Sequence, residues 1–380
     1  MRISETTEGR TRLFVPRESL LSDVPPTVPA FFNPAASTNR DVTVAMTEAA
    51  GGATFCDSLS GVGARGLRVA TEGAHDIEVT LVDFNRDALK LAEKSARANG
   101  VKGRCTIACE EARTFLHSRY GKGEKFDLVD VDPFGTPAPF LHALVSAVSD
   151  GGVVSATATD TAALCGVYPA VSRRRYSAKP LNNHFHHETG ARILLNAVRR
   201  EAGILDRGMV PLAAHSTRHY IRVYARVEDG AAKADAALRN EGYVTACSKC
   251  HHVAASGVPP KACEECGGKV RWAGPLWVGA LTDKKVLSKA AEAAKKGGLD
   301  GARRILVGLE GVDAFPPWGY SIDGICSQLG VATVPEARVR KLLADAGFTS
   351  GRQPFEKTGL KTAAPYAEVL EAVRRASLRG

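Results

Sequence analysis

Short apolar runs alternate with amphipathic stretches through residues 46 to about 225. The amphipathic stretches include 86–99, where apolar residues recur at helical spacing along one face. Regular alternation of strand and helix is typical of a doubly wound, mostly parallel sheet. The pattern therefore predicts an α/β fold, with strands at 53–59, 78–83, 104–108, 127–132, 152–158 and 219–226.

The segments on either side differ from this alternating region. Residues 1–45 are extended and Pro-rich and end in FFNPAASTNRD. After Val227 the chain reads EDGAAKADAALRNEG, which predicts a linker or a helix, and a cysteine cluster follows. The last fifty residues predict a small helical module with a β-wing. Because 380 residues exceed one compact core, we expect three regions, at 1–45, 46–227 and 228–380.

Composition and charge narrow the class of protein. With 44% hydrophobic and 24% charged residues, the chain is typical of a globular protein. A net charge of +9 suits a polyanionic partner such as nucleic acid, although many basic proteins bind none. We expect no membrane span, because no signal peptide and no 18-residue apolar run occurs. The nine cysteines include two tight pairs, which favours a metal site in a reducing cytoplasm over disulfides.

The first predicted strand leads into DSLSGVGARG, which contains Gly61, Gly63 and Gly66 in a G-x-G-x-x-G pattern. Such glycines permit a tight turn and a close approach of the backbone to a ligand. The ligand could be a dinucleotide or S-adenosylmethionine, and the glycines could also serve only a turn with positive φ angles. The glycine motif alone is therefore a weak signal.

Two later acids strengthen the nucleotide interpretation. The second strand ends in Asp83, where a carboxylate could accept both ribose hydroxyls, and the third leads to Glu110, Glu111 and Ala112. The stretch DFNRDALKLAEKSARANGV resembles the second strand and helix of class I methyltransferases. Asp83 could instead cap the following helix, and Glu111 could be a solvated acid. The sequential order favours an adenosyl cofactor over NAD.

The fourth strand ends in FDLVDVDPFGTPAPF, which places Asp132 at the ligand edge of the sheet. Pro133 cannot continue a central strand, so its carbonyl is free to point into a pocket, and Phe134 offers a flat apolar face. Two acceptors beside a stacking ring suit methyl transfer to the amine of a flipped base. A helix N-cap Asp followed by Pro is the alternative. Asp130, on the same face, makes pure capping a weaker explanation.

The cysteine cluster has the spacing of a metal site. Cys247-x2-Cys250 is followed, after twelve residues, by Cys263-x2-Cys266. Four thiolates with no open position indicate a structural Zn2+, although His251 or His252 could replace one of them. The remaining cysteines are interpreted as small buried apolar residues, namely Cys56, Cys105, Cys109, Cys165 and Cys326.

Basic residues cluster at 172–188, which reads SRRRYSAKPLNNHFHHE, after the fifth predicted strand. A basic loop at this edge could grip phosphates beside a flipped base. A solvated charge run, with histidines that pack or cap a helix, is the simpler alternative. The basic segments 284–304 and 338–341 are interpreted as helix faces.

DPFGTPAPF together with FFNPAASTNRD closely resembles the tRNA guanine-26 N2-dimethyltransferase family. Further motifs extend the resemblance over nearly the whole chain, namely SGVGARGLR, RRRYSAKP, HHETGARILL, GPLWVG, SIDGICSQL and GLKTAAP. The resemblance implies a Rossmann-like class I methyltransferase domain, an N-terminal extension that completes the active site, and a smaller zinc-containing α+β C-terminal domain. It also implies S-adenosylmethionine-dependent transfer of one or two methyl groups to the exocyclic N2 of guanosine 26 in tRNA. We expect the protein to be cytoplasmic and monomeric.

The family's site residues carry over by position. Asp132 and the Pro133 carbonyl would hold the amino group, and Phe31 and Phe134 would sandwich the guanine. The cofactor would be lined by Arg40, Asp57, Gly61, Gly63, Arg65, Asp83, Glu111 and Ala112.

Two departures from the family pattern stand out, namely Ala35-Ala36 where larger residues are usual, and the loop at 351–353. Three alternatives remain. The chain could methylate another RNA or DNA base amine, or be a non-catalytic zinc-ribbon RNA-binding protein. An NAD oxidoreductase is disfavoured, because no hydride-handling His or Tyr constellation accompanies the glycines.

Overall fold

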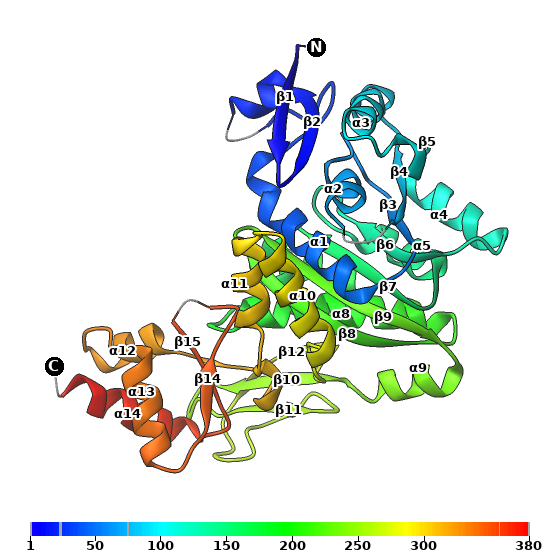
Figure 1. Cartoon of the computed structure of the whole chain (residues 1–380). Coiled ribbons are helices and arrows are strands. Elements are labelled where there is room, and N and C mark those ends of the chain that lie inside the picture. Colours follow the sequence, from blue (N-terminus) through cyan, green and yellow to red (C-terminus); the bar gives the residue numbers. More distant parts are fainter. Residues whose placement is uncertain (1, 23–24, 74–75, 357, 379–380) are drawn as a thin grey trace.

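The computed structural model describes residues 2–22, 25–73, 76–356 and 358–378. A seven-stranded sheet, in the order β5-β4-β3-β6-β7-β9-β8, forms its centre (Figure 1). Its strands are β3 (Thr54–Asp57), β4 (Glu78–Asp83), β5 (Cys105–Cys109), β6 (Phe126–Val131), β7 (Val148–Ala158), β8 (Arg207–Thr217) and β9 (Tyr220–Asp229). The first five run parallel, and β9 pairs antiparallel with both β7 and β8. The predicted α/β fold with a mainly parallel sheet is confirmed.

Each strand predicted for this sheet is present, with unchanged ends at 78–83 and shifted ends in the other five, but β8 was not predicted. Its sequence, RGMVPLAAHST, contains Pro211, which lacks the N–H needed for a central strand. The structure resolves the conflict by placing β8 at the edge of the sheet, with a register shift between Pro211 and Ala213. An edge position tolerates proline because one side of the strand needs no partner.

Helices cover both faces of this sheet. They are α1 (Ser37–Ala50), α2 (Ala64–Glu72), α3 (Arg86–Ala98), α4 (Ala112–Gly121), α5 (Leu141–Ala147), α6 (Thr161–Leu164), α7 (Pro169–Tyr176) and α8 (His186–Ile204). Alternate strand residues divide between two apolar clusters: Leu128 lies with α1 and α2, and its neighbour Val129 lies with α5 and α8.

The N- and C-terminal elements lie at opposite ends of the molecule (Figure 1). The N-terminal hairpin comprises β1 (Ile3–Glu8) and β2 (Thr11–Pro16). Beyond β9 come α9 (Ala231–Leu238) and a sheet of β10 (Glu241–Cys247), β11 (Val253–Ser256) and β12 (Val270–Trp277). Then follow α10 (Lys284–Lys296) and α11 (Asp300–Gly308). The C-terminal module contains β13 (Tyr320–Ser321), α12 (Ile322–Leu329), α13 (Glu336–Asp345), β14 (Ser350–Arg352), β15 (Gly359–Thr362) and α14 (Tyr366–Ser377).

The elements after β9 pack closely against the central domain. The helices α10 and α11 contact α1, and Leu287 and Ala290 share an apolar cluster with Val42 and Met46. Helix α8 lies between β8 and β9 on one side and β12 on the other. A separate C-terminal domain starting at 228 therefore stays a prediction. No helix in the described ranges is both long and apolar enough to cross a membrane.

A fully buried ion pair ties the C-terminal module to α8. Lys361 of β15 donates to both oxygens of Glu188, each at 2.8 Å, and to the Pro316 carbonyl at 2.8 Å. Arg192 and Gln353 donate to the same carboxylate, at 2.7 Å each. Burial alone would raise the pKa of Glu188, but Lys361 and Arg192 outweigh it and lower the pKa to about 2.

Replacing Lys361 by alanine is expected to loosen this junction, because Glu188 would stay buried with only part of its compensating charge. Breaking a buried pair from one side typically costs about 3–5 kcal/mol. The effect is measured as a lower thermal midpoint and faster amide exchange in α8 and β15. The exposed Lys341 provides the control as Lys341→Ala. Equal stability of the two variants would contradict the role of Lys361.

Candidate active site

The glycine loop after β3 has the conformation that its sequence predicts. Gly61 and Gly63 adopt positive φ angles of 52° and 78°. A Cβ on Gly66 would lie 2.4 Å from a methyl group of Leu81 in β4, so only glycine allows α2 to pack this closely on the sheet. The loop therefore turns tightly at the carboxyl edge of β3.

Two predicted cofactor acids hold this loop in place. Asp83 accepts from the backbone N–H groups of Gly61 and Asn85, each at 2.8 Å. Asp57 is buried and accepts from the Gly66 N–H at 3.0 Å. Burial raises the pKa of Asp57 to about 7, although Arg65 opposes the shift. Helix α3 is capped by Asn85 rather than by Asp83, so the capping alternative for Asp83 does not describe the structure.

The remaining predicted cofactor residues also have structural partners. Glu111 caps α4, where it accepts from the Thr114 N–H at 3.0 Å, and Ala112 is buried at the first turn. Arg40 makes a two-pronged ion pair with Glu8 of the N-terminal hairpin, at 2.6 and 2.5 Å. These contacts explain the side chains structurally and leave their cofactor roles as predictions.

A small cavity lies where the loop, α1 and β6 meet. Its volume is about 90 Å³, whereas pockets that enclose a whole ligand typically measure roughly 300–1,000 Å³. Its lining includes six of the predicted site residues, namely Phe31, Arg40, Asp57, Gly61, Arg65 and Asp132. The other predicted residues lie outside this lining, namely Gly63, Asp83, Glu111, Ala112, Pro133 and Phe134.

A larger hollow of about 700 Å³ lies elsewhere, between α1 and α10. It is lined by residues at the C-terminal ends of α1 and α2, including Ala49 and Glu72. These helix ends face the amino edge of the parallel strands, whereas ligands of doubly wound sheets bind at the carboxyl edge. The small cavity is therefore the better candidate despite its size.

Asp132 is held by a buried ion network. Arg65 of α2 is ion-paired with Asp132 and, at 3.2 Å, with Asp130 of β6. Arg222 of β9 pairs with the other oxygen of Asp130, and both side chains are fully buried. Burial raises the pKa of Asp130, but Arg222 and Arg65 outweigh it and hold the pKa below its usual value.

Five polar side chains on α1, β7 and β9 complete this network. They are Asn39 and Thr43 of α1, Ser155 and Thr157 of β7, and Tyr224 of β9. The Thr43 hydroxyl accepts from Arg65 at 2.5 Å and from Arg222 at 3.0 Å, so it joins the two guanidinium groups. Sequence analysis did not identify Arg222, although an Arg flanked by apolar residues within a predicted strand could have indicated a buried charge.

The structure brings the two predicted stacking rings together. Phe31 and Phe134 lie 4.7 Å apart between ring centroids at an angle of 84°, so they meet edge to face. A base cannot insert between rings this close unless one of them turns. Phe134 is 69% exposed, which leaves its face available to a partner. Pro133 is buried, and no hydrogen bond from the described residues reaches its carbonyl.

Phe84 is an exposed ring that sequence analysis did not single out. It follows Asp83 directly at the end of β4 and is 74% exposed. The ring follows an acid at the carboxyl edge of the sheet, where ligands of doubly wound sheets bind. The position of Phe84 directly after a predicted strand could have identified it from the sequence.

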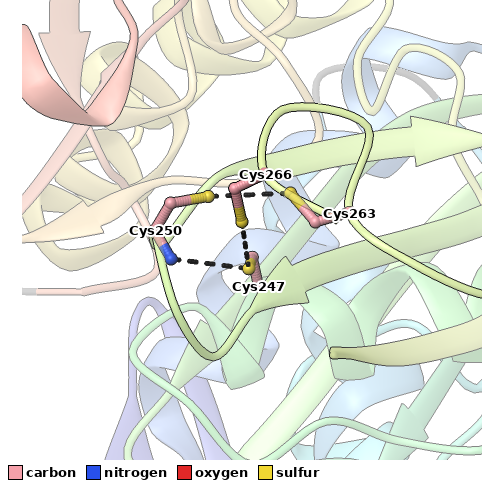
Figure 2. A group of neighbouring side chains, drawn as sticks. All are labelled: Cys247, Cys250, Cys263 and Cys266. Carbon is pink, nitrogen blue, oxygen red and sulfur yellow. Dashed lines mark hydrogen bonds between the residues drawn. The ribbon is translucent and has the colours of Figure 1, made fainter. Parts of the chain in front are cut away.

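The four predicted zinc ligands form one cluster (Figure 2). The Sγ atoms of Cys247 and Cys266 lie 3.6 Å apart, as do those of Cys250 and Cys263. These distances far exceed a disulfide bond of about 2.05 Å. They match the separation of about 3.8 Å expected for thiolates bound at 2.3 Å around tetrahedral zinc.

The two cysteine pairs have matching backbone geometry. The N–H of Cys247 donates to the His252 carbonyl and that of Cys263 to the Gly268 carbonyl, each at 2.9 Å. The residue after each pair, His251 or Gly267, has a positive φ angle, of 58° or 67°. Each pair therefore forms a tight knuckle. N–H groups of the first knuckle lower the pKa of the Cys247 thiol to about 6.

Two other sequence interpretations have different outcomes. Cys109 is exposed at the end of β5, so its assignment as a buried residue was wrong, because the strand ends at the sheet edge. In the basic loop, Arg175 pairs with Asp160 at 2.9 Å, while Arg173 and Arg174 are exposed. These two arginines lie on α7, close in sequence to the carboxyl end of β7.

Comparisons with known proteins agree with the fold. A family model described as N2,N2-dimethylguanosine tRNA methyltransferase matches residues 9–374. A curated tRNA (guanine(26)-N(2))-dimethyltransferase of Methanopyrus kandleri is 36% identical over 375 residues, which cover 98% of this chain and 97% of the relative. The enzyme of the same name from Methanothermobacter thermautotrophicus is 34% identical over 377 residues, which cover 96% and 97%.

A solved structure supports the same assignment. Trm1 from Pyrococcus horikoshii, determined with S-adenosyl-L-methionine, superposes with a TM-score of 0.84 at 29% identity. The superposition covers 97% of this chain and 99% of that one. The chain therefore belongs to the N2,N2-dimethylguanosine tRNA methyltransferase family.

Proposed function

We propose that the chain transfers methyl groups from S-adenosylmethionine to the exocyclic N2 of guanosine 26 in tRNA. The observation that carries the proposal is Asp132, held by Arg65 at the mouth of the cavity beside Phe31 and Phe134. The names of the relatives supply the substrate and the cofactor.

Asp132 and Pro133 act as acceptors for the amino group. The lone pair of an exocyclic amine is delocalised into the base, so the nitrogen is a poor nucleophile. Arg65 contacts only the Oδ2 atom of Asp132, which leaves Oδ1 for one N–H of the substrate. The Pro133 carbonyl would accept the other. Two acceptors draw the nitrogen toward tetrahedral geometry and aim its lone pair at the methyl donor.

The aromatic rings hold the base. A guanine must leave the RNA stack to reach Asp132, and a flipped base is commonly gripped between flat side chains. Phe134 would turn from its edge contact with Phe31 to stack on the purine. The exposed Arg173 and Arg174 would bind phosphates next to the flipped nucleotide.

The residues around the glycine loop fit an adenosyl cofactor. When bound, S-adenosylmethionine supplies an electrophilic methyl group on a sulfonium. The loop would follow the cofactor backbone at Gly61 and Gly63, with Arg40, Asp57 and Arg65 at the cavity wall. Asp83 would accept from the ribose, Glu111 and Ala112 would lie beside the adenine, and Phe84 would stack on it. The Asp83 carboxylate already accepts two backbone N–H groups of the protein, so a ribose hydroxyl would have to donate to one of its remaining lone pairs.

The cysteine cluster would bind a structural Zn2+. Four sulfur donors at tetrahedral spacing leave no position for substrate, so the ion would stabilise the sheet of β10, β11 and β12 rather than take part in chemistry. A cytoplasmic monomer with tRNA as its partner remains our expectation.

Asp132→Ala is expected to lower methyl transfer by at least roughly 10²-fold, the typical cost of losing one polar contact to the reacting group. The affinity for tRNA should stay within about twofold, because phosphate contacts dominate binding. Methyl incorporation and tRNA affinity are measured on one preparation. Asp345→Ala, at an exposed acid in α13, is the control. Retained activity in Asp132→Ala would contradict the assigned role.

Mass spectrometry of nucleosides identifies the product and the base. Incubation of tRNA and S-adenosylmethionine with the protein should yield N2-methylated guanosine only when position 26 is guanosine. Methylation of another base amine would support the alternative substrate. Binding of tRNA without any product would indicate the non-catalytic RNA-binding alternative.

Cys263→Ser is expected to release the zinc and to lower the thermal midpoint of the protein, because structural zinc stabilises the fold that holds it. Zinc content by plasma mass spectrometry and thermal unfolding are the two measurements. Cys109→Ser, at an exposed cysteine outside the cluster, should change neither. Unchanged zinc content in Cys263→Ser would refute the site.

A further inference from the structure

A second group of metal-ligating side chains lies apart from the four-cysteine cluster. Cys165 follows α6, and His186 and His187 begin α8. One ligand atom of each lies within 4.8 Å of the other two. The Cys165 side chain is buried, and the two histidines are half-buried. Neither the methyl-transfer site nor the basic loop gives these three side chains a role.

Hydrogen bonds orient both histidine rings. The Nδ1 atom of His186 contacts the Asn183 carbonyl, and that of His187 lies 2.7 Å from Oε1 of Glu356. Both partners are oxygen acceptors, so each Nδ1 is the donor and each Nε2 is the ring nitrogen that could bind a metal. Metal-binding histidines in proteins typically donate their second N–H in this way, to a carbonyl or a carboxylate.

Cys165 is buried close to the two histidines. A bound divalent cation would hold its sulfur as the thiolate and neutralise the resulting charge in place.

We propose that Cys165, His186 and His187 bind a second transition-metal ion, with Zn2+ as the cation that fits best. One thiolate and two imidazoles suit zinc, whose bonds of 2.0–2.3 Å place tetrahedral ligands about 3.3–3.8 Å apart. The ligand atoms lie within 4.8 Å of one another, and side-chain rotation would have to bring them into this range when the ion binds. Three protein ligands leave a fourth position for water, and Glu356 orients His187 from outside.

The site would join three parts of the fold. Cys165 follows the catalytic edge of β7, the histidines begin α8, and Glu356 belongs to the C-terminal module. A metal ion here would fix the C-terminal module against the catalytic sheet, next to the buried pair of Glu188 and Lys361. The site would be independent of the proposed methyl transfer, because none of its three ligands lines the cavity at Asp132.

Metal stoichiometry tests the proposal on the full chain. Protein loaded with Zn2+ and dialysed against a weak chelator is expected to hold two ions per chain, and Cys165→Ala and His187→Gln one each. Cys326→Ala removes another buried cysteine, in α12, and should keep two. A value of one ion in the unmodified protein, or of two in Cys165→Ala, would overturn the second site.

X-ray absorption keeps the proposal testable if a variant fails to fold. The zinc edge of the unmodified, fully loaded protein should show imidazole scattering together with sulfur. Cys247→Ser removes one ligand of the four-cysteine cluster and should leave that imidazole signal in place. A purely sulfur ligand shell in the unmodified protein, or loss of the imidazole signal in Cys247→Ser, would show that the histidines bind no metal of their own.

Discussion

The candidate active site depends on the buried ion network of Arg65, Asp130, Asp132 and Arg222. Arg222 and Asp130 are fully buried, so each charge would be costly without the other. The network draws its members from α2, β6 and β9, with polar partners on α1 and β7. Any shift of one element breaks a charge pair, so the network locks the relative positions of five elements.

This locking sets the geometry of Asp132. Its Oδ2 is tied to Arg65, and Arg65 is in turn tied to Asp130 and to Asn39 of α1. Arg65 therefore holds the carboxylate in one orientation, and in the proposed function it would not have to be ordered when the substrate binds. The same arginine lines the cavity proposed for the cofactor, so one side chain would position both substrates.

Local sequence patterns predicted much of the fold, but they could not predict which side chains distant in the sequence would pair. The apolar runs predicted six strands, and the glycine spacing predicted a tight loop. The close packing of Gly66 against Leu81 explains why a glycine is needed there. The cysteine spacing predicted a cluster that the structure brings together. By contrast, Arg222 and Asp130 are 92 residues apart, and their pairing follows only when β9 is known to lie beside β7. Glu111 and Asp83 show the same limit, because their backbone partners depend on the exact ends of α4 and β4.

Helix α8 transmits this order to the rest of the chain. One face packs on β8 and β9, which carry Arg222, and another packs on β12 of the cysteine-rich sheet. Arg192 donates to Glu188 within the helix, to the carbonyl of Trp277 at the end of β12 at 3.1 Å and to that of Gly279 at 2.8 Å. The first turn of α8 meets the C-terminal module through Glu188 and Lys361. Helix α8 therefore links the C-terminal module to the sheet that carries Asp130 and Arg222 through direct packing and a buried ion pair rather than through a flexible linker.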